Sequence, residues 1–252
     1  MGLPVDAPPD AALVPLRVLV FDLDDTLLDE RPGRVAGRAA LDAALLEAFP
    51  GLPEASFSEA YDRARLAFWR DPGNHRRGRL DLVAARTEIV SVALREAGCE
   101  SGFDARGASQ CYFAAATAAQ CLMPGALEVL EHARSRYDRL VLLTNGAAEP
   151  QSAKIQQFEL ADWFDHIQIE GAFGLGKPEP KAFRSAVDAV GATVGAAVMV
   201  GNNYEHDVLG ALSAGLGAVW IDLEGRGAPP EPPHGLCGTI QDIRELASLL
   251  ER

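Results

Sequence analysis

Residues 18–26, with the sequence VLVFDLDDT, constrain the fold more than any other stretch of this chain. Four apolar residues lead directly into Asp22, and a short apolar run that ends in acidic groups is typical of a buried strand. Side chains alternate along a strand, so we expect Asp22 and Asp24 to project in the same direction. Two converging carboxylates repel each other unless a cation lies between them, and oxygen ligands suit Mg²⁺. The stretch therefore predicts a magnesium site at the end of a strand.

Further short apolar runs predict that this strand belongs to a parallel sheet. They occupy residues 140–143, 197–200 and 218–221, a further short strand is expected at 167–170, and stretches with helical spacing lie between them. This alternation predicts an α/β fold with a doubly wound parallel sheet, whose right-handed crossovers bring all strand carboxyl ends to one edge. Ligands bind at such an edge. We expect the polar groups that follow strands or occupy the loops between them to meet there: Asp22, Thr144, Lys177 and Asn202.

The stretch 30–121 interrupts the sheet after its first strand. Its apolar spacing predicts helices over 34–49, 60–69, 80–97 and 104–121, and it contains no good strand. We therefore expect an inserted all-α cap domain at 30–121 that covers the sheet edge. The α/β core then comprises residues 16–29 and 122–252, with a last helix over 240–251, and the proline-rich residues 1–15 form a loose tail.

Charge and cysteine content limit the classes of partner and compartment. The net charge of −13 argues against a nucleic acid polymer or an anionic membrane as the main partner, because both require basic surface. A local cation can still attract a small anionic substrate. No apolar run reaches the roughly 20 residues of a membrane span, and no signal peptide is recognisable. The four cysteines form no CxxC pair, which favours free thiols in a reducing cytoplasm.

Four motifs together make the chain resemble the haloacid dehalogenase superfamily, in particular its phosphatase branch. They are DLDDT at 22–26, Thr144-Asn145-Gly146, Lys177 between Gly176 and Pro178, and GNNYEHD at 201–207. Each motif alone is weak, but their order along the chain and their positions after strands make the set specific. The segment 142–154 and the fourth motif are most similar to the N-acylneuraminate-9-phosphatase and pyrimidine 5′-nucleotidase group. The resemblance implies a Rossmann-like core with a helical C1-type cap.

The resemblance also implies a role for each motif residue. Asp22 would attack phosphorus to form an aspartyl-phosphate, and Asp24 would act as general acid and then as general base. Thr144 and the Asn145 backbone would bind phosphoryl oxygens, and Lys177 would offset their charge. The implied activity is Mg²⁺-dependent hydrolysis of small phosphate monoesters, such as sugar phosphates or nucleotides. The implied metal ligands are Asp22, Asp24 and residues of the fourth motif.

The fourth motif departs from the family pattern, because Asn202 stands where an acid is usual. An amide oxygen can bind Mg²⁺ but brings no charge, so affinity should fall. Asp207 either replaces it as a ligand or orients Lys177. Three alternatives to the phosphatase remain open: a phosphomutase, a 2-haloacid dehalogenase, against which Asp24 argues, and a catalytically weak binding or regulatory protein.

A basic cluster lies in the stretch predicted as cap. It comprises Arg70, His75, Arg76, Arg77 and Arg79. We interpret it as a solvated loop in preference to a grip on an anionic substrate tail. The physiological substrate and the oligomeric state are open at this point.

Overall fold

The computed structural model describes residues 17–51, 53–99, 102–227 and 231–250. Its centre is a six-stranded sheet in the order β5-β4-β1-β6-β7-β8, in which all paired strands run parallel. This confirms the predicted α/β fold class. The strands are β1 (Val18–Phe21), β4 (Arg139–Thr144), β5 (His166–Ile169), β6 (Ala197–Gly201), β7 (Gly217–Ile221) and β8 (Leu236–Ile240).

The strand order reverses at β1, and this reversal determines where a ligand can bind. β1 pairs with β4 on one side and with β6 on the other, so that Phe21 lies beside Leu142 and Val200. At such a point, the connections that follow neighbouring strands run in opposite directions, and a crevice forms outside the carboxyl ends of the strands. Asp22 follows directly, and its backbone N–H donates to Val200 O at 2.9 Å.

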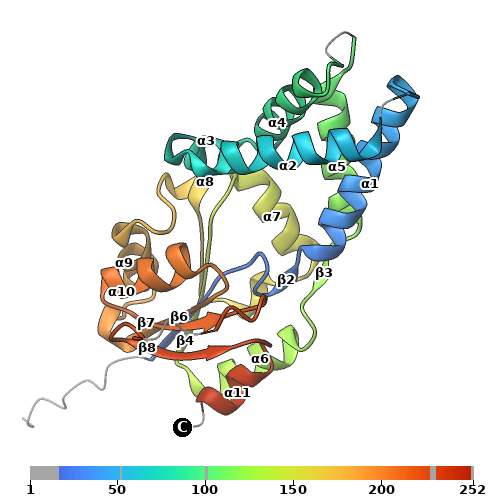
Figure 1. Cartoon of the computed structure of the whole chain (residues 1–252). Coiled ribbons are helices and arrows are strands. Elements are labelled where there is room, and N and C mark those ends of the chain that lie inside the picture. Colours follow the sequence, from blue (N-terminus) through green and yellow to red (C-terminus); the bar gives the residue numbers. More distant parts are fainter. Residues whose placement is uncertain (1–16, 52, 100–101, 228–230, 251–252) are drawn as a thin grey trace, which may run out of the picture.

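Helices cover both faces of the sheet, which explains why its strands are almost continuously apolar. Leu19 and Phe21 point into one hydrophobic cluster, and Val18 and Val20 point into the other. The first face is covered by α6 (Ala126–Arg136), α7 (Ala148–Gln157) and α11 (Glu245–Leu250), and the second by α9 (Pro180–Asp188) and α10 (Gly210–Ala214) (Figure 1). Short helical turns complete the core: α8 (Glu170–Phe173), 3-10 turns Ala161–Trp163 and Val194–Ala196, and a π-helical turn Tyr204–Leu209.

Five helices form a separate group with its own hydrophobic cluster. They are α1 (Arg31–Ala48), α2 (Glu54–Arg70), α3 (Pro72–Leu80), α4 (Leu82–Glu96) and α5 (Ala105–Ala118). Figure 1 shows them together at a distance from the sheet. The chain enters the group through β2 (Leu28–Asp29) and leaves it through β3 (Cys121–Leu122), and these strands pair antiparallel. Division into domains at residues 30 and 121 stays a prediction, and the predicted tail 1–15 lies outside the described residues.

Two local predictions were wrong. The last helix does not begin at 240: residues 236–240 form β8, and α11 begins at Glu245. This strand contains Gly238 and owes its conformation to pairing with β7, which local propensity does not reveal. The predicted basic loop is instead mostly helix α3. Pro72 occupies its first turn, and the Asp71 side chain caps it by accepting from Gly73 N at 2.9 Å.

Two further observations concern the cysteines and the lengths of the helices. Cys99, Cys111, Cys121 and Cys237 form no disulfide with one another. Within the described residues, no helix combines the length and the apolar character that crossing a membrane requires.

Close packing of α1 against α5 generates a stability prediction. A Cβ at Gly37 would lie 2.8 Å from the Tyr112 ring and 2.8 Å from its carbonyl oxygen. We expect Gly37→Ala to lower the free energy of unfolding by about 1–3 kcal/mol, because a methyl group there overpacks the contact. Urea unfolding measures this, with Gly51→Ala as control, since a Cβ at Gly51 meets nothing within 4 Å. Equal stability of the two variants would contradict the predicted packing constraint.

Candidate active site

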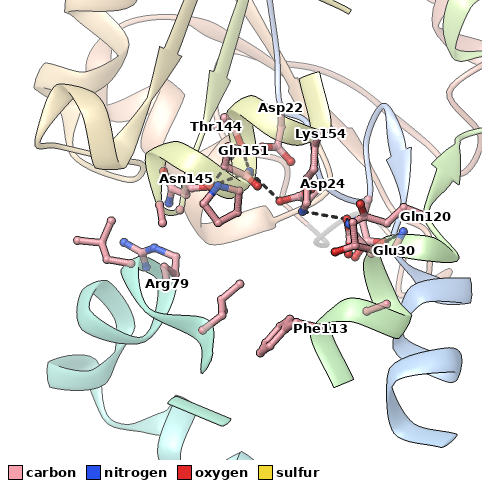
Figure 2. Close-up of a pocket in the computed structure, with 18 of the residues that line it drawn as sticks. Asp22, Asp24, Glu30, Arg79, Phe113, Gln120, Thr144, Asn145, Gln151 and Lys154 are labelled. Atoms are coloured by element: carbon pink, nitrogen blue, oxygen red, sulfur yellow. Dashed lines mark hydrogen bonds and ion pairs between the residues drawn. The ribbon is translucent and has the colours of Figure 1, made fainter. Parts of the chain in front are cut away.

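A cavity of about 750 Å³ lies at the carboxyl ends of β1, β4 and β6, and residues of α3, α4 and α5 line its other side. Figure 2 shows side chains from both parts of the chain around it. All seven residues predicted for the site line it: Asp22, Asp24, Thr144, Asn145, Lys177, Asn202 and Asp207. The structure therefore brings together residues that are separated by up to 185 positions in the sequence. Their individual roles stay predictions.

Lys177 lies between two carboxylates in the interior of the protein. Its Nζ is 2.5 Å from Asp22 Oδ1 and 2.7 Å from Asp207 Oδ1. Burial disfavours charge on Lys177, but attraction to Asp207 and Asp22 outweighs it and raises the pKa of the ammonium. Burial also raises the pKa of Asp22 to about 7, because Lys177 compensates only part of the cost and Asp207 adds repulsion. One cation is thus shared by two acids.

Asp207 is fully engaged by protein groups. Its second oxygen, Oδ2, accepts from the Asn203 backbone N–H at 2.8 Å. The close approach requires glycine at position 201, where a Cβ would lie 2.3 Å from this oxygen. Asn202 also lines the pocket, and its backbone carbonyl accepts from Trp220 Nε1 at 2.9 Å.

Asp24 belongs to a second polar network, and sequence reasoning missed its other members. Asp24 Oδ1 lies 2.7 Å from Lys154 Nζ, and Oδ2 accepts from Gln151 Nε2 at 2.9 Å. Lys154 also pairs with Glu30 at 3.0 Å, and Glu30 accepts from Gln120 Nε2 at 2.8 Å (Figure 2). Burial and repulsion by Asp24 raise the pKa of Glu30. The available signal was that residues 151 and 154 share one face of the helix that follows the second motif.

The second motif connects this network to Lys177. Thr144 Oγ1 accepts from Gln151 Nε2 at 2.7 Å. The Asn145 side chain donates to the Lys177 carbonyl and accepts from its backbone N–H, both at 2.7 Å. Asn145 therefore fixes the loop that carries Lys177, a contact that its assignment as a backbone phosphate ligand did not include.

The arginines of α3 are largely paired. Arg79 lines the pocket, and its Nε and Nη2 donate to the Glu170 carboxylate at 3.1 and 3.0 Å. Arg76 donates to the Gly174 carbonyl at 3.0 Å, and Arg77 pairs with Glu88 at 2.9 Å. The helix thereby attaches the five-helix group to the α/β part.

The oxygen donors at the end of β1 fit a hard divalent cation. They comprise one Asp22 carboxylate, the Asp24 backbone carbonyl implied by the resemblance, and the Asn202 amide. Among the described residues, no group of three or more His, Cys, Asp or Glu side chains could hold a metal ion. A cation beside Asp22 would favour its ionised form, which burial disfavours. The donor set therefore fits Mg²⁺ with less negative charge than two or three acids would supply.

Comparison with known proteins agrees with the geometry. The sequence model of the haloacid dehalogenase-like hydrolases matches residues 16–215. Phosphoserine phosphatase of Thermus thermophilus is 35% identical over 92% of this chain and 98% of its own length. N-acylneuraminate-9-phosphatase of Mus musculus is 29% identical over 94% of both chains. Among solved structures, the magnesium-bound HAD-hydrolase YfnB from Bacillus subtilis has a TM-score of 0.72 at 22% identity and covers 95% of this chain and 100% of its own, which supports the fold.

The raised pKa of Asp22 predicts a pH-dependent stability. Its pKa is about 7 in the folded protein, against the usual 3.8. Between these values the folded state binds more protons than the unfolded state, so raising the pH lowers stability. Asp22→Asn removes this titration. We therefore expect the free energy of unfolding of the variant, relative to that of the wild type, to increase by about 3 kcal/mol as the pH rises from 4 to 8. Urea unfolding in EDTA at several pH values measures this, and a pH-independent difference would contradict it.

Proposed function

The chain belongs to the haloacid dehalogenase-like hydrolases, and from this membership we propose that it is a Mg²⁺-dependent phosphatase that hydrolyses small phosphate monoesters through an aspartyl-phosphate. Sugar phosphates and nucleotides are the substrate classes we propose. One observation carries this proposal: Asp22 and Asp24 line one pocket but belong to different networks, one centred on Lys177 and the other on Lys154. Two acids in different surroundings can act as nucleophile and as proton carrier.

In the first half of the reaction, an Asp22 oxygen forms a bond to phosphorus, and the bond from phosphorus to the leaving oxygen breaks. Asp24 gives its proton to that leaving oxygen. Lys177, 2.5 Å from Asp22, compensates negative charge on the nucleophile and the phosphoryl group. Thr144 and the Asn145 backbone hold phosphoryl oxygens. Mg²⁺, held by Asp22, the Asp24 carbonyl and Asn202, would supply further charge neutralisation when bound.

In the second half, water attacks phosphorus and releases phosphate from Asp22. Asp24 accepts the proton from this water, for which it must be ionised. The ion pair with Lys154 at 2.7 Å and the hydrogen bond from Gln151 at 2.9 Å hold the Asp24 carboxylate in place. Lys154 therefore acts on the reaction through Asp24 and is a positioning residue.

Of the two roles open to Asp207, its contacts support the orientation of Lys177. Both of its oxygens already accept from protein groups, Lys177 and the Asn203 backbone. Binding a metal would require one of these bonds to be given up. We therefore propose Asn202 as the fourth-motif ligand.

We further propose that residues 30–121 act as a cap that closes the pocket over a substrate. The support is that α3, α4 and α5 contribute pocket-lining residues. We propose a cytoplasmic location, for which the absence of disulfides among the four cysteines is the support. A second candidate function, a catalytically weak regulatory protein, is favoured only by the uncharged Asn202.

Replacement of the nucleophile tests the reaction type. We expect Asp22→Asn to lower turnover of p-nitrophenyl phosphate by more than about a thousandfold, because no aspartyl-phosphate can form. Wild-type turnover should also disappear in EDTA. The control Asp25→Asn removes a neighbouring pocket carboxylate, which pairs with Arg34, and is expected to retain turnover. Hydrolysis by Asp22→Asn at the wild-type rate would refute the nucleophile assignment.

Restoring an acid at position 202 tests the metal ligand. We expect Asn202→Asp to tighten Mg²⁺ binding about tenfold, because a carboxylate adds charge to the donor set. Calorimetric titration and the magnesium dependence of activity both measure this. Asn203→Asp is the matched control, since it adds the same charge one residue away, at a side chain that caps the following turn. An unchanged affinity in Asn202→Asp would favour Asp207 as the ligand.

A further inference from the structure

Arg86, on α4, differs from the other cations that line the pocket. Arg34, Arg79, Lys154 and Lys177 each lie within 4.0 Å of at least one carboxylate: Asp25, Glu170, Asp24 with Glu30, and Asp22 with Asp207, respectively. Among the ion pairs of the described residues, none includes Arg86. The pocket wall thus contains a guanidinium for which the described residues provide no counter-ion.

Aromatic side chains hold this guanidinium in place. Its carbon lies 3.5 Å from the centroid of the Tyr112 ring and 5.2 Å from that of Phe113. Its Nη1 donates to the Tyr61 hydroxyl. Stacking and one neutral hydrogen bond orient an arginine but do not neutralise it. Arg86 is therefore fixed in position and still charged.

The Nε edge of Arg86 is not used by the protein. Nε is buried without a hydrogen-bond partner. Among the hydrogen bonds of the described residues, the Arg86 side chain donates through Nη1 and not through Nη2. In Arg79 and Arg31, the same pair of nitrogens holds a carboxylate in two parallel hydrogen bonds. This fork is the geometry that matches a planar or tetrahedral oxyanion. The edge of Arg86 is thus suited to an anion that the described residues do not provide.

Arg86 lies where the end of a substrate away from the scissile phosphate would be bound. It stacks near Phe113, which Figure 2 shows on the side of the pocket away from Asp22. From Phe113, the wall continues through Ala116 and Thr117 to Gln120, at helical spacing. Gln120 reaches Asp24 through Glu30 and Lys154, and its Oε1 is a second buried atom without a partner. A ligand that contacts both Asp22 and Arg86 would therefore span this wall.

We propose that Arg86 binds a second oxyanion, a carboxylate or a phosphate, on the leaving group of the substrate. The enzyme then prefers phosphate monoesters that carry another acidic group at the end away from the scissile phosphate. This inference rests on the proposed phosphatase function. Its electrostatic basis is that a protein of net charge −13 repels a multiply charged anion unless a local cation without a partner attracts it.

Matched substrate pairs test the proposal. One pair is 3-phosphoglycerate and sn-glycerol 3-phosphate, which differ by a carboxylate, and the other is fructose 1,6-bisphosphate and fructose 6-phosphate, which differ by a phosphate. We expect wild-type kcat/KM to favour the acidic member of at least one pair by about 10- to 100-fold. Which pair shows the preference identifies the oxyanion. Arg86→Met should reduce this ratio at least about tenfold, mainly through KM, and Arg86→Lys should retain part of it.

The ratio is independent of how much of a variant is folded, because the active fraction cancels between two substrates. Arg34→Met is the matched control, since Arg34 lines the same pocket but pairs with Asp25 at 2.8 Å, and its ratio should stay at the wild-type value. A wild-type ratio near one in both pairs, or equal losses in Arg86→Met and Arg34→Met, would overturn the proposal.

A binding experiment separates this inference from the proposed function. D-glycerate carries the carboxylate without a phosphate, and glycerol lacks both. Calorimetry should detect tighter binding of D-glycerate than of glycerol to the wild type, and Arg86→Met should abolish the difference. If the wild type hydrolyses neither the four substrates nor p-nitrophenyl phosphate, the phosphatase proposal fails, while glycerate binding still decides the role of Arg86. Equal glycerate affinity in wild type and Arg86→Met would refute that role.

Discussion

The buried ion pairs of Lys177 are the interaction on which the site depends. They join three segments that are far apart in the sequence: the end of β1, the loop before α9 and the turn after β6. Removing a partner from such a group leaves a buried charge uncompensated, so the three segments must keep their positions together. Asn145 reinforces this from β4 by holding the Lys177 backbone. Burial raises the pKa of Asp22, and repulsion from Asp207 adds to this effect. Because one ammonium serves two carboxylates, the site also retains negative charge, which suits a divalent cation.

The second polar network, around Lys154, connects the α/β part of the chain to the five-helix group. Asp24 is connected through Lys154 to Glu30, and Glu30 is connected to Gln120. Glu30 precedes the first helix of the five-helix group, and Gln120 follows its last. The carboxylate proposed to carry the proton is therefore attached to both crossings between the two parts of the chain. A displacement of the helices would be transmitted to Asp24 through side chains, whereas Asp22 is held within the α/β part.

Sequence reasoning predicted five of the six strands from local apolar patterns, and it predicted the seven pocket residues from their positions at strand ends together with the family motifs. Apolar runs identify strands, and the parallel arrangement then brings the residues that follow them to one edge. It missed β8 because that strand depends on pairing with β7, and it missed α3 because the Asp-Pro start was interpreted only as a turn. The roles of Gln151 and Lys154 depend on their contacts with Asp24, which lies more than 120 residues earlier in the sequence, so local patterns do not reveal them. Arg86 is an ordinary helical arginine in sequence. Only its surroundings distinguish it: its guanidinium stacks on the Tyr112 ring, and among the described residues no carboxylate lies within 4.0 Å of it.

The antiparallel pairing of β2 with β3 has a consequence for how such a protein changes over evolutionary time. The helical group begins and ends on adjacent strands, about 5 Å apart, so any replacement segment has only to bring its two ends to that separation. An insertion of this kind can lengthen, shorten or be exchanged without altering the order of strands in the sheet. On the roles proposed above, recombination within residues 30–121 would change the substrate that is bound, while Asp22 and Lys177, the proposed nucleophile and its cation, lie outside the exchanged stretch.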